Sequence, residues 1–218
     1  MQKAENGFFI GIDLGWKEKK TTGLCVLQKG RPVLLKDVFG KDVLKLICPY
    51  LAGVKVIAID APLTQGRGKG KMRLYEKFLS TSIFRREKVN PLPPALIFKL
   101  ADFGREIVKK LEGKGFVLGL NLIETFPTLV KKLCGSNLNQ FLQGPAPCQT
   151  ENQRSSLICA VLAFLHFNFK TRYLGYKDGF LFLPEMSFWK KDWQRKFYQA
   201  WQQRDRLRYR RLITNIGR

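Results

Sequence analysis

Three acidic residues stand at corresponding places in the sequence, each directly after a short apolar run. They are Asp13, Asp60 and Glu124. Such a run is typical of a buried strand, and a buried charge is costly unless it is paired or binds a metal. Neighbouring carboxylates suit hard divalent cations such as Mg²⁺ or Mn²⁺, which take oxygen ligands. The repetition therefore predicts a functional acidic site where three strands end.

Each of these acids also has a purely structural interpretation. Asp13 could bond to backbone amides at its strand end, and Asp60 could cap the turn that Ala61 and Pro62 begin. Glu124 could be a loop acid, because Pro127 follows it closely. The occurrence of three acids at matched strand ends favours the functional interpretation.

Hydrophobic periodicity and turn residues indicate the elements that must position the acids. Strands are predicted at residues 8–14, 22–28, 32–38, 55–60 and 117–124, with a hairpin at 173–183. Helices are predicted at residues 41–51, 72–80, 95–112, 128–133 and 151–166, and irregular structure at 82–94 and 135–148. The first two strands are joined by a short charged connection and should be antiparallel, and the third follows through a turn at Gly30-Arg31-Pro32. A strand, helix, strand crossover makes the strand at 55–60 parallel to its neighbour. The succession of strands and helices favours an α/β fold class.

Net charge, cysteine content and hydropathy limit the kinds of partner, metal site and cellular location to be expected. The 218 residues carry a net charge of +22, and such a field favours polyanionic partners, chiefly nucleic acid. The five cysteines form no CxxC pair and there is a single histidine, which argues against a zinc site or a disulfide framework. No apolar run reaches the length of a membrane span and no signal-peptide pattern begins the chain. We expect a cytoplasmic protein without a membrane partner.

Two basic loops lie close in sequence to the strand-end acids. The segment after Asp13 carries Lys17, Lys19 and Lys20, and the segment after Asp60 carries Arg67, Lys69, Lys71 and Arg73. The second segment is rich in glycine, but its spacing does not match a phosphate-binding P-loop. These side chains are predicted to contact the phosphates of a nucleic acid, with a solvated surface as the alternative.

The C-terminal segment differs from the rest of the chain. We predict a core domain over residues 1–186 and a basic, aromatic helical tail over residues 187–218. Residues 189–218 include ten Lys and Arg against two Asp, and Trp193, Phe197 and Trp201 recur every four residues. This aromatic face could dock on the core, or the tail could grip nucleic acid as an arm. Its candidate phosphate contacts are Arg204, Arg206, Arg208, Arg210 and Arg211.

Five segments occur in an order that resembles a known family. They are FIGIDLG (9–15), VIAIDAPL (56–63), LIETFPTLVKKL (122–133), SLICAVLAFL (156–165) and DGFLFLP (178–184). Together they are similar to domain-of-unknown-function family 429, a family regarded as predicted nucleases with a ribonuclease H-like fold. The resemblance covers roughly residues 8–184.

The resemblance implies a five-stranded mixed sheet, with three antiparallel strands followed by two parallel ones. It implies that Asp13, Asp60 and Glu124 are catalytic and bind metal at the sheet edge, with Mg²⁺ or Mn²⁺ as cofactor. Two ions about 4 Å apart could clamp the attacking and leaving oxygens of a phosphodiester. It also leaves a homodimer open.

One position departs from the family pattern. The last helix of the family opens with an Asp, whereas this chain has Ser155 there. Glu151 lies one helical turn earlier and could supply the fourth metal ligand. Alternatively, Glu151 is only a first-turn acid that favours the helix dipole.

The sequence thus predicts a metal-dependent nuclease that acts on DNA or RNA. The alternative is a non-catalytic nucleic-acid-binding protein on a degenerate nuclease fold, which the serine at position 155 favours. A sugar kinase or chaperone-type ATPase of the actin-like fold fits less well, because the chain has room for only one such domain and lacks a second phosphate loop.

Overall fold

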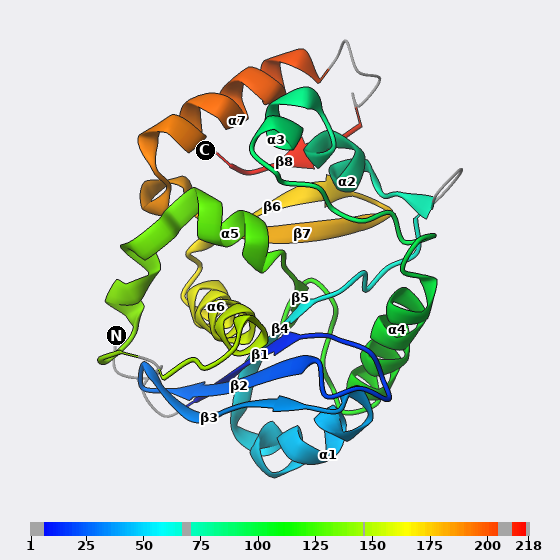
Figure 1. Ribbon diagram of the computed structural model, residues 1–218, viewed down its shortest axis with the longest axis vertical. Helices are drawn as coiled ribbons and strands as arrows, with labels where there is room; N and C mark the ends of the chain where they lie inside the picture. Colours follow the sequence, from blue (N-terminus) through cyan, green and yellow to red (C-terminus); the bar gives the residue numbers. More distant parts are fainter. Residues whose placement is uncertain (1–6, 67–70, 146, 205–210, 217–218) are drawn as a thin grey trace.

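A five-stranded mixed sheet forms the centre of the molecule. The computed structural model describes residues 7–66, 71–145, 147–204 and 211–216. The sheet has the order β3-β2-β1-β4-β5, and its strands are β1 (Phe8–Asp13), β2 (Thr22–Gln28), β3 (Arg31–Val38), β4 (Val54–Asp60) and β5 (Leu122–Glu124). The first three strands pair antiparallel, whereas β1 with β4 and β4 with β5 pair parallel. The predicted α/β class and mixed sheet are confirmed (Figure 1).

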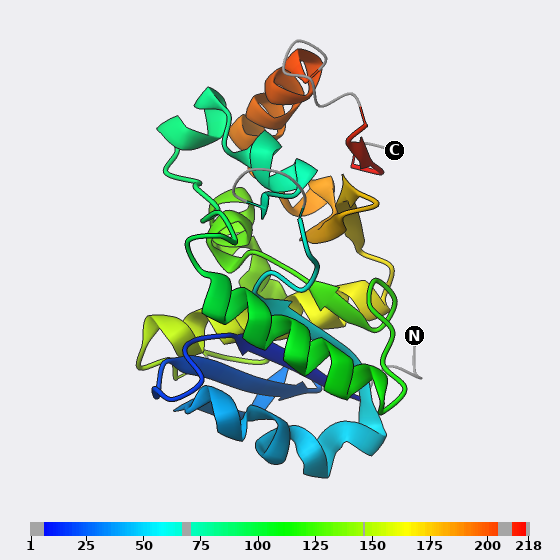
Figure 2. The ribbon, with the colours of Figure 1, turned by 90° about the vertical axis from the view of Figure 1, so that its right-hand side faces the viewer.

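Helices cover both faces of this sheet (Figure 2). Alternate residues of β1 and β4 belong to two different buried clusters, as the period of a strand requires. One cluster joins the sheet to α6 (Glu151–Phe167), and the other joins it to α1 (Val43–Ile47) and α4 (Phe98–Glu112). Because both faces are buried, the end of the sheet is where its residues can reach a ligand.

Two glycines allow α6 to lie unusually close to the sheet. A Cβ on Gly11 of β1 would come within 2.0 Å of the carbonyl oxygen of Ser156. A Cβ on Gly23 of β2 would meet the carbonyl oxygen of Asn152 at the same distance. The first turns of α6 are therefore pressed against the ends of β1 and β2, which is where Asp13 lies.

A smaller sheet extends the molecule away from the central sheet. It has the order β7-β6-β8, formed by β6 (Thr171–Tyr176), β7 (Gly179–Pro184) and β8 (Ile213–Thr214). The hairpin of β6 and β7 matches the predicted one. The remaining helices are α2 (Leu74–Leu79), α3 (Ser82–Arg86), α5 (Pro127–Cys134) and α7 (Lys191–Gln203), and 3-10 turns cover Gly40–Asp42, Cys48–Gly53, Gly135–Phe141 and Met186–Phe188.

The aromatic face of α7 packs inward. Trp193 and Phe197 are buried in the same cluster as residues of α6, and their rings contact Phe84 and Phe78 respectively. This face therefore docks on the rest of the molecule, which was one of the two alternatives for the tail. A domain boundary after residue 186 stays a prediction.

Three expectations about elements were wrong in detail. Residues 82–94, expected to be irregular, contain α3. The segment 135–148, expected to be a loop, begins with a 3-10 turn. The last strand, β5, does not begin at residue 117, because residues before it form a turn in which Gly119 has φ +86° and Asn121 Oδ1 accepts from the Val117 amide. Within the described parts of the chain, no helix is both long and apolar enough to cross a membrane.

Candidate functional site

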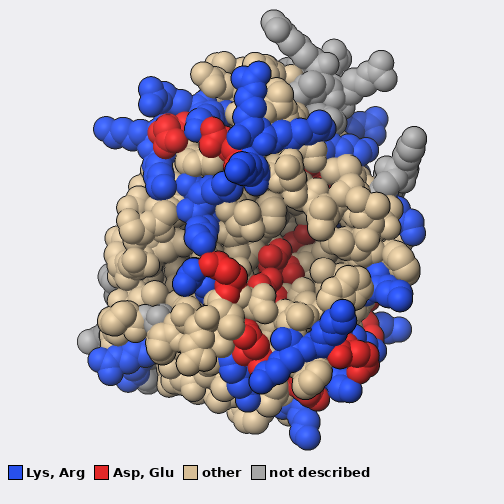
Figure 3. Space-filling view, viewed as in Figure 1, with Lys and Arg blue, Asp and Glu red and all other residues tan. Residues whose placement is uncertain are grey.

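Asp13 and Asp60 lie side by side at one end of the central sheet. They are register partners on the parallel strands β1 and β4, so both side chains project from the same face. Each is partly exposed, and both line a cleft of about 350 Å³. Figure 3 shows acidic side chains on the floor of a central hollow, with Lys and Arg gathered around its rim.

The environment of these two acids opposes their ionisation. The pKa of Asp13 is raised to about 7, chiefly by burial; a hydrogen bond from Ser155 opposes this rise and the charge of Asp37 adds to it. Burial also raises the pKa of Asp60 well above its usual range, and the charges of Asp13 and Glu124 add to this. Two like charges held together disfavour their common ionised state. The pair is therefore a place where a proton or a cation would be held.

The N-terminal turns of α6 complete this side of the site. Thr150 caps the helix by accepting from the Gln153 amide at 3.1 Å, and its hydroxyl donates to Asp37 Oδ1 at 3.0 Å. Asp37 is on β3 and lies across β2 from Asp13, with Gly23 between them in register. Asp37 was not among the site residues predicted from the sequence. Like Asp13 and Asp60, it is an acid near the end of a predicted strand, and this pattern could have indicated it.

Ser155 lies on the first turns of α6, and it hydrogen-bonds to Asp13. A neutral hydroxyl at this position stabilises the ionised form of Asp13 but adds no negative charge.

Glu124 is close to the pair but has a different environment. Glu124 is in register with Ile59 and not with Asp60. It therefore lies one residue before the level of Asp13 and Asp60 along the strand direction. Its carboxylate accepts from the Leu63 amide at 2.9 Å, from Arg73 Nη1 at 2.6 Å and from the Tyr75 hydroxyl. Burial raises the pKa of Glu124, whereas Arg73 and these hydrogen bonds lower it.

Arg73 is held in the interior instead of in a solvated loop. It is only 1% exposed, and besides Glu124 it forms an ion pair with Glu76 of α2. The guanidinium carbon of Arg73 lies over the ring of Tyr75, 4.8 Å from the ring centroid. Sequence reasoning placed Arg73 among basic loop residues and missed Glu76 and Tyr75, because a partner across the fold leaves no local pattern.

The donor set at the sheet end fits one divalent ion better than two. Asp13 and Asp60 provide oxygen ligands without an ion pair to any described residue. The oxygens of Glu124 are already engaged by Arg73, Tyr75 and a backbone amide. Within the described residues, no group of three His, Cys, Asp or Glu side chains is arranged to hold a metal ion. Mg²⁺ commonly needs only one or two carboxylates, because water and substrate phosphate complete its shell.

Glu151 lies apart from the cleft. It is exposed at the start of α6 and forms ion pairs with Lys131 at 3.4 Å and with Arg154. It is not among the residues that line the cleft around Asp13. Its position matches the alternative in which it is a first-turn acid of the helix.

The predicted phosphate contacts occupy several environments. Lys17, Lys19 and Lys20 are exposed after β1, and Lys17 bonds to Glu106 of α4. Lys71 and Arg211 are exposed, whereas the guanidinium of Arg204 packs on the ring of Trp201 at 4.4 Å. The remaining predicted contacts lie outside the described residues: Arg67, Lys69, Arg206, Arg208 and Arg210.

The segment between α3 and α4 also lines the cleft. Lys88 and Asn90 are exposed there, and Leu92 of this segment and Leu100 of α4 provide apolar surface. Sequence reasoning treated this segment only as irregular. The cleft thus joins an acidic floor, an exposed lysine and an apolar wall.

The chain was compared with models of protein families, with curated proteins and with solved structures, and none of the three comparisons found a significant match.

Proposed function

We propose that this protein is a metal-dependent nuclease of ribonuclease H-like fold, similar to domain-of-unknown-function family 429. The observation that carries the proposal is the pairing of Asp13 with Asp60, side by side on parallel strands in an open cleft. Both lack a cationic partner among the described side chains, and burial opposes their ionisation. A divalent cation would relieve that repulsion.

In this proposal Asp13 and Asp60 hold one Mg²⁺ or Mn²⁺ ion, and water and a substrate phosphate provide its other ligands. When bound, the ion supplies Lewis-acid polarisation of the phosphodiester and lowers the pKa of a bound water. Ser155 orients the Asp13 carboxylate through its hydrogen bond. Glu124 acts as a positioning residue, because it fixes Arg73 in the wall of the cleft through the 2.6 Å ion pair.

The basic surface supports a nucleic-acid substrate. The net charge of +22 provides attraction to a phosphate backbone over a long range. Lys88 at the mouth of the cleft is exposed and available to a phosphate next to the acid pair. Positive charge at the rim and negative charge at the floor are the arrangement that a metal-bridged phosphate needs.

A second candidate function is nucleic-acid binding without cleavage. Two observations favour it: Ser155 replaces an acid of the family pattern, and Glu124 is engaged by Arg73. With only Asp13 and Asp60 free, a two-ion arrangement lacks ligands among the described residues. This candidate predicts nucleic-acid binding that weakens steeply with salt and needs no divalent ion.

Cleavage of labelled DNA and RNA with Mg²⁺, Mn²⁺ or a chelator separates the two candidates. We expect cleavage that requires the metal and that falls more than about a hundredfold in Asp13→Asn and Asp60→Asn. Glu151→Gln serves as the matched control, because it removes an exposed carboxylate at the start of α6 that does not line the cleft. Binding without cleavage in any metal would support the second candidate, and cleavage that survives both Asp substitutions would refute the assigned site.

A further inference from the structure

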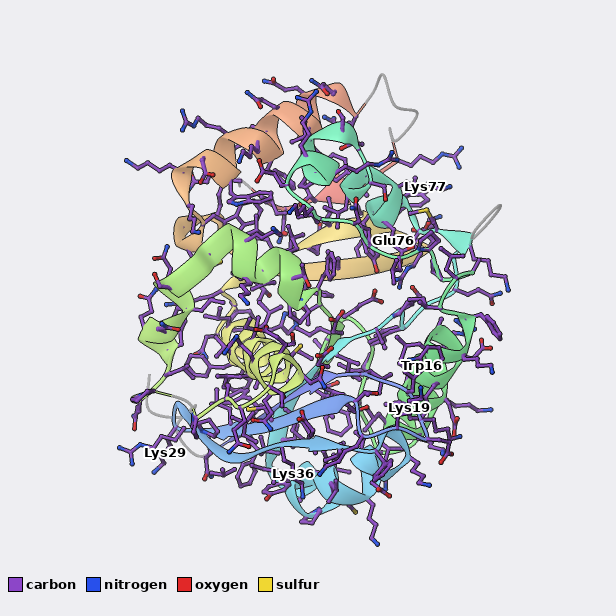
Figure 4. The ribbon with its side chains drawn as sticks, viewed as in Figure 1. Trp16, Lys19, Lys29, Lys36, Glu76 and Lys77 are labelled. Carbon is purple, nitrogen blue, oxygen red and sulfur yellow. The ribbon has the colours of Figure 1, made fainter. Side chains whose placement is uncertain are left out.

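A groove next to the acid cleft contains the most exposed tryptophan of the protein. Trp16 is 45% exposed, whereas Trp189 and Trp193 are buried and Trp201 is partly buried. The groove has a volume of about 600 Å³ and lies between the segment after β1 and the first turns of α4. Figure 4 shows Trp16 and Lys19 beside α4. A large exposed aromatic side chain in a groove often marks a binding site.

The groove continues directly from the acid cleft. Asp13 and Leu14 line the cleft, and the residues that follow, Gly15 to Lys19, line the groove. Leu100 of α4 belongs to both. A polymer with its phosphate at the acid pair would therefore place a neighbouring unit at Trp16.

The backbone that carries Trp16 is fixed before any ligand binds. The Trp16 amide donates to Thr21 Oγ1 at 3.1 Å, and the Gly15 amide donates to Thr22 Oγ1 at 3.0 Å. The carbonyl of Lys17 accepts from the Lys41 amide at 3.0 Å. An exposed ring on a fixed backbone loses little conformational freedom when a ligand stacks on it.

The charges of the groove leave lysines free for phosphate. Its three acids are each paired with a base: Glu18 with Lys41, Asp102 with Arg105, and Glu106 with Lys17 and Lys110. Lys19 and Lys99 line the groove, are exposed and have no ion pair with a described residue. The groove therefore combines an exposed indole ring with two ammonium groups that form no ion pair with a described residue.

We propose that this groove binds an unpaired nucleobase stacked on Trp16, so that the substrate of the acid cleft is single-stranded nucleic acid. The inference rests on the proposed nuclease function for the role of the cleft. Bases in a duplex are stacked on each other and do not present a face to a side chain, whereas those of a single strand do. The lysines would hold the phosphates on either side of the stacked base.

The test measures binding without metal, so that it does not depend on cleavage. A fluorescent oligothymidylate of about ten nucleotides is titrated with the protein and compared with a duplex of equal length. We expect tighter binding of the single strand, weakened about tenfold or more by Trp16→Ala. Phe169→Ala is the control, because Phe169 is 89% exposed and follows α6 at the opposite end of the sheet.

A second measurement guards against misfolding of the alanine variant. In the native protein the oligonucleotide should quench tryptophan emission, and in Trp16→Phe it should bind while this quenching is lost. Equal affinity for single strand and duplex, no binding of either, or an affinity unchanged by Trp16→Ala would overturn the inference. Failure of the nuclease proposal would appear separately, as binding of the single strand without cleavage in Mg²⁺ or Mn²⁺.

Discussion

The acidic edge of the central sheet consists of two regions that look alike in sequence and differ in charge balance. Asp13 and Asp60 are adjacent carboxylates that form no ion pair with a described residue, and burial raises the pKa of both. Glu124 is more deeply buried, yet it forms an ion pair with Arg73 and accepts two further hydrogen bonds. Among the residues that the structure describes, the second region has a paired cation, Arg73, and the first has none.

The role of an acid at the end of a strand therefore depends on its charged and hydrogen-bonding neighbours, and not on its position in the sequence alone. A buried ion pair that is fully hydrogen-bonded is a structural unit, and removing either member leaves an isolated charge. A pair of buried acids without a cation destabilises the fold, and such pairs are typical of functional sites that bind a ligand. Substitutions at the two regions should therefore have opposite effects on stability.

The largest effect is expected from Arg73→Met. The substitution leaves the carboxylates of Glu124 and Glu76 buried without their shared cation, which should lower the free energy of unfolding by about 3–5 kcal/mol. Urea denaturation measures it. The matched control is Arg105→Met, which removes an exposed i,i+3 ion pair with Asp102 and should change stability by less than about 1 kcal/mol. Equal losses in the two variants would show that the Arg73 network is not a structural unit.

Asp13→Asn should stabilise the metal-free protein. The pKa of Asp13 is about 7 in the folded chain and 3.8 in the reference state, so the folded state holds more protons between these values and loses stability as pH rises through them. The asparagine side chain does not titrate. At about pH 8 the free energy of unfolding of the variant should exceed that of the native protein by at most about 4 kcal/mol. The gain should vanish near pH 4. Unfolding curves at both pH values check the prediction, and a loss of stability at the higher pH would contradict it.

Metal binding should depend on pH through the same group. Because the ion must displace the proton of Asp13, the affinity for Mn²⁺ should fall about tenfold for each pH unit below about 7. Since burial and the charge of Asp13 also raise the pKa of Asp60, the dependence on pH should continue above that pH. Competition with a fluorescent chelator measures the affinity, and an affinity that is flat between about pH 5 and 7 would exclude Asp13 as a ligand.

The smallest effect is expected from Glu151→Gln. Glu151 is exposed and its ion pairs with Lys131 and Arg154 are on the surface, so stability should change by less than about 1 kcal/mol. Metal affinity should change by less than about threefold, since only weak long-range attraction is lost. A tenfold or greater loss of Mn²⁺ affinity would instead make Glu151 part of the metal site.

Much of the fold could be predicted because local patterns determine it. The apolar runs around Asp13 and Asp60 located β1 and β4, and the turn residues Asp178 and Gly179 located the hairpin. The strand, helix, strand order predicted that β4 is parallel to its sheet neighbour, and the structure shows that this neighbour is β1. These features depend on residues that are close in the sequence.

The balance of charge in the site could not be predicted, because it depends on contacts across the fold. Arg73 precedes Glu124 by 51 residues, and nothing in either segment indicates their 2.6 Å ion pair. The register of β5 could not be predicted from the sequence either. A turn precedes the strand, so β5 begins later than expected and Glu124 is in register with Ile59. A pattern of three strand-end acids therefore predicted the edge of the sheet but not which acids stay free.

Calorimetric titration of Mn²⁺ tests the central claim most directly. It is performed on the native protein and on Asp13→Asn, in each case with a short oligonucleotide of non-hydrolysable backbone so that phosphate can complete the coordination. We predict that one ion binds per chain and that Asp13→Asn abolishes this binding. Two ions per chain, or binding that is indifferent to Asp13, would contradict the assignment of the Asp13 and Asp60 pair as the metal site.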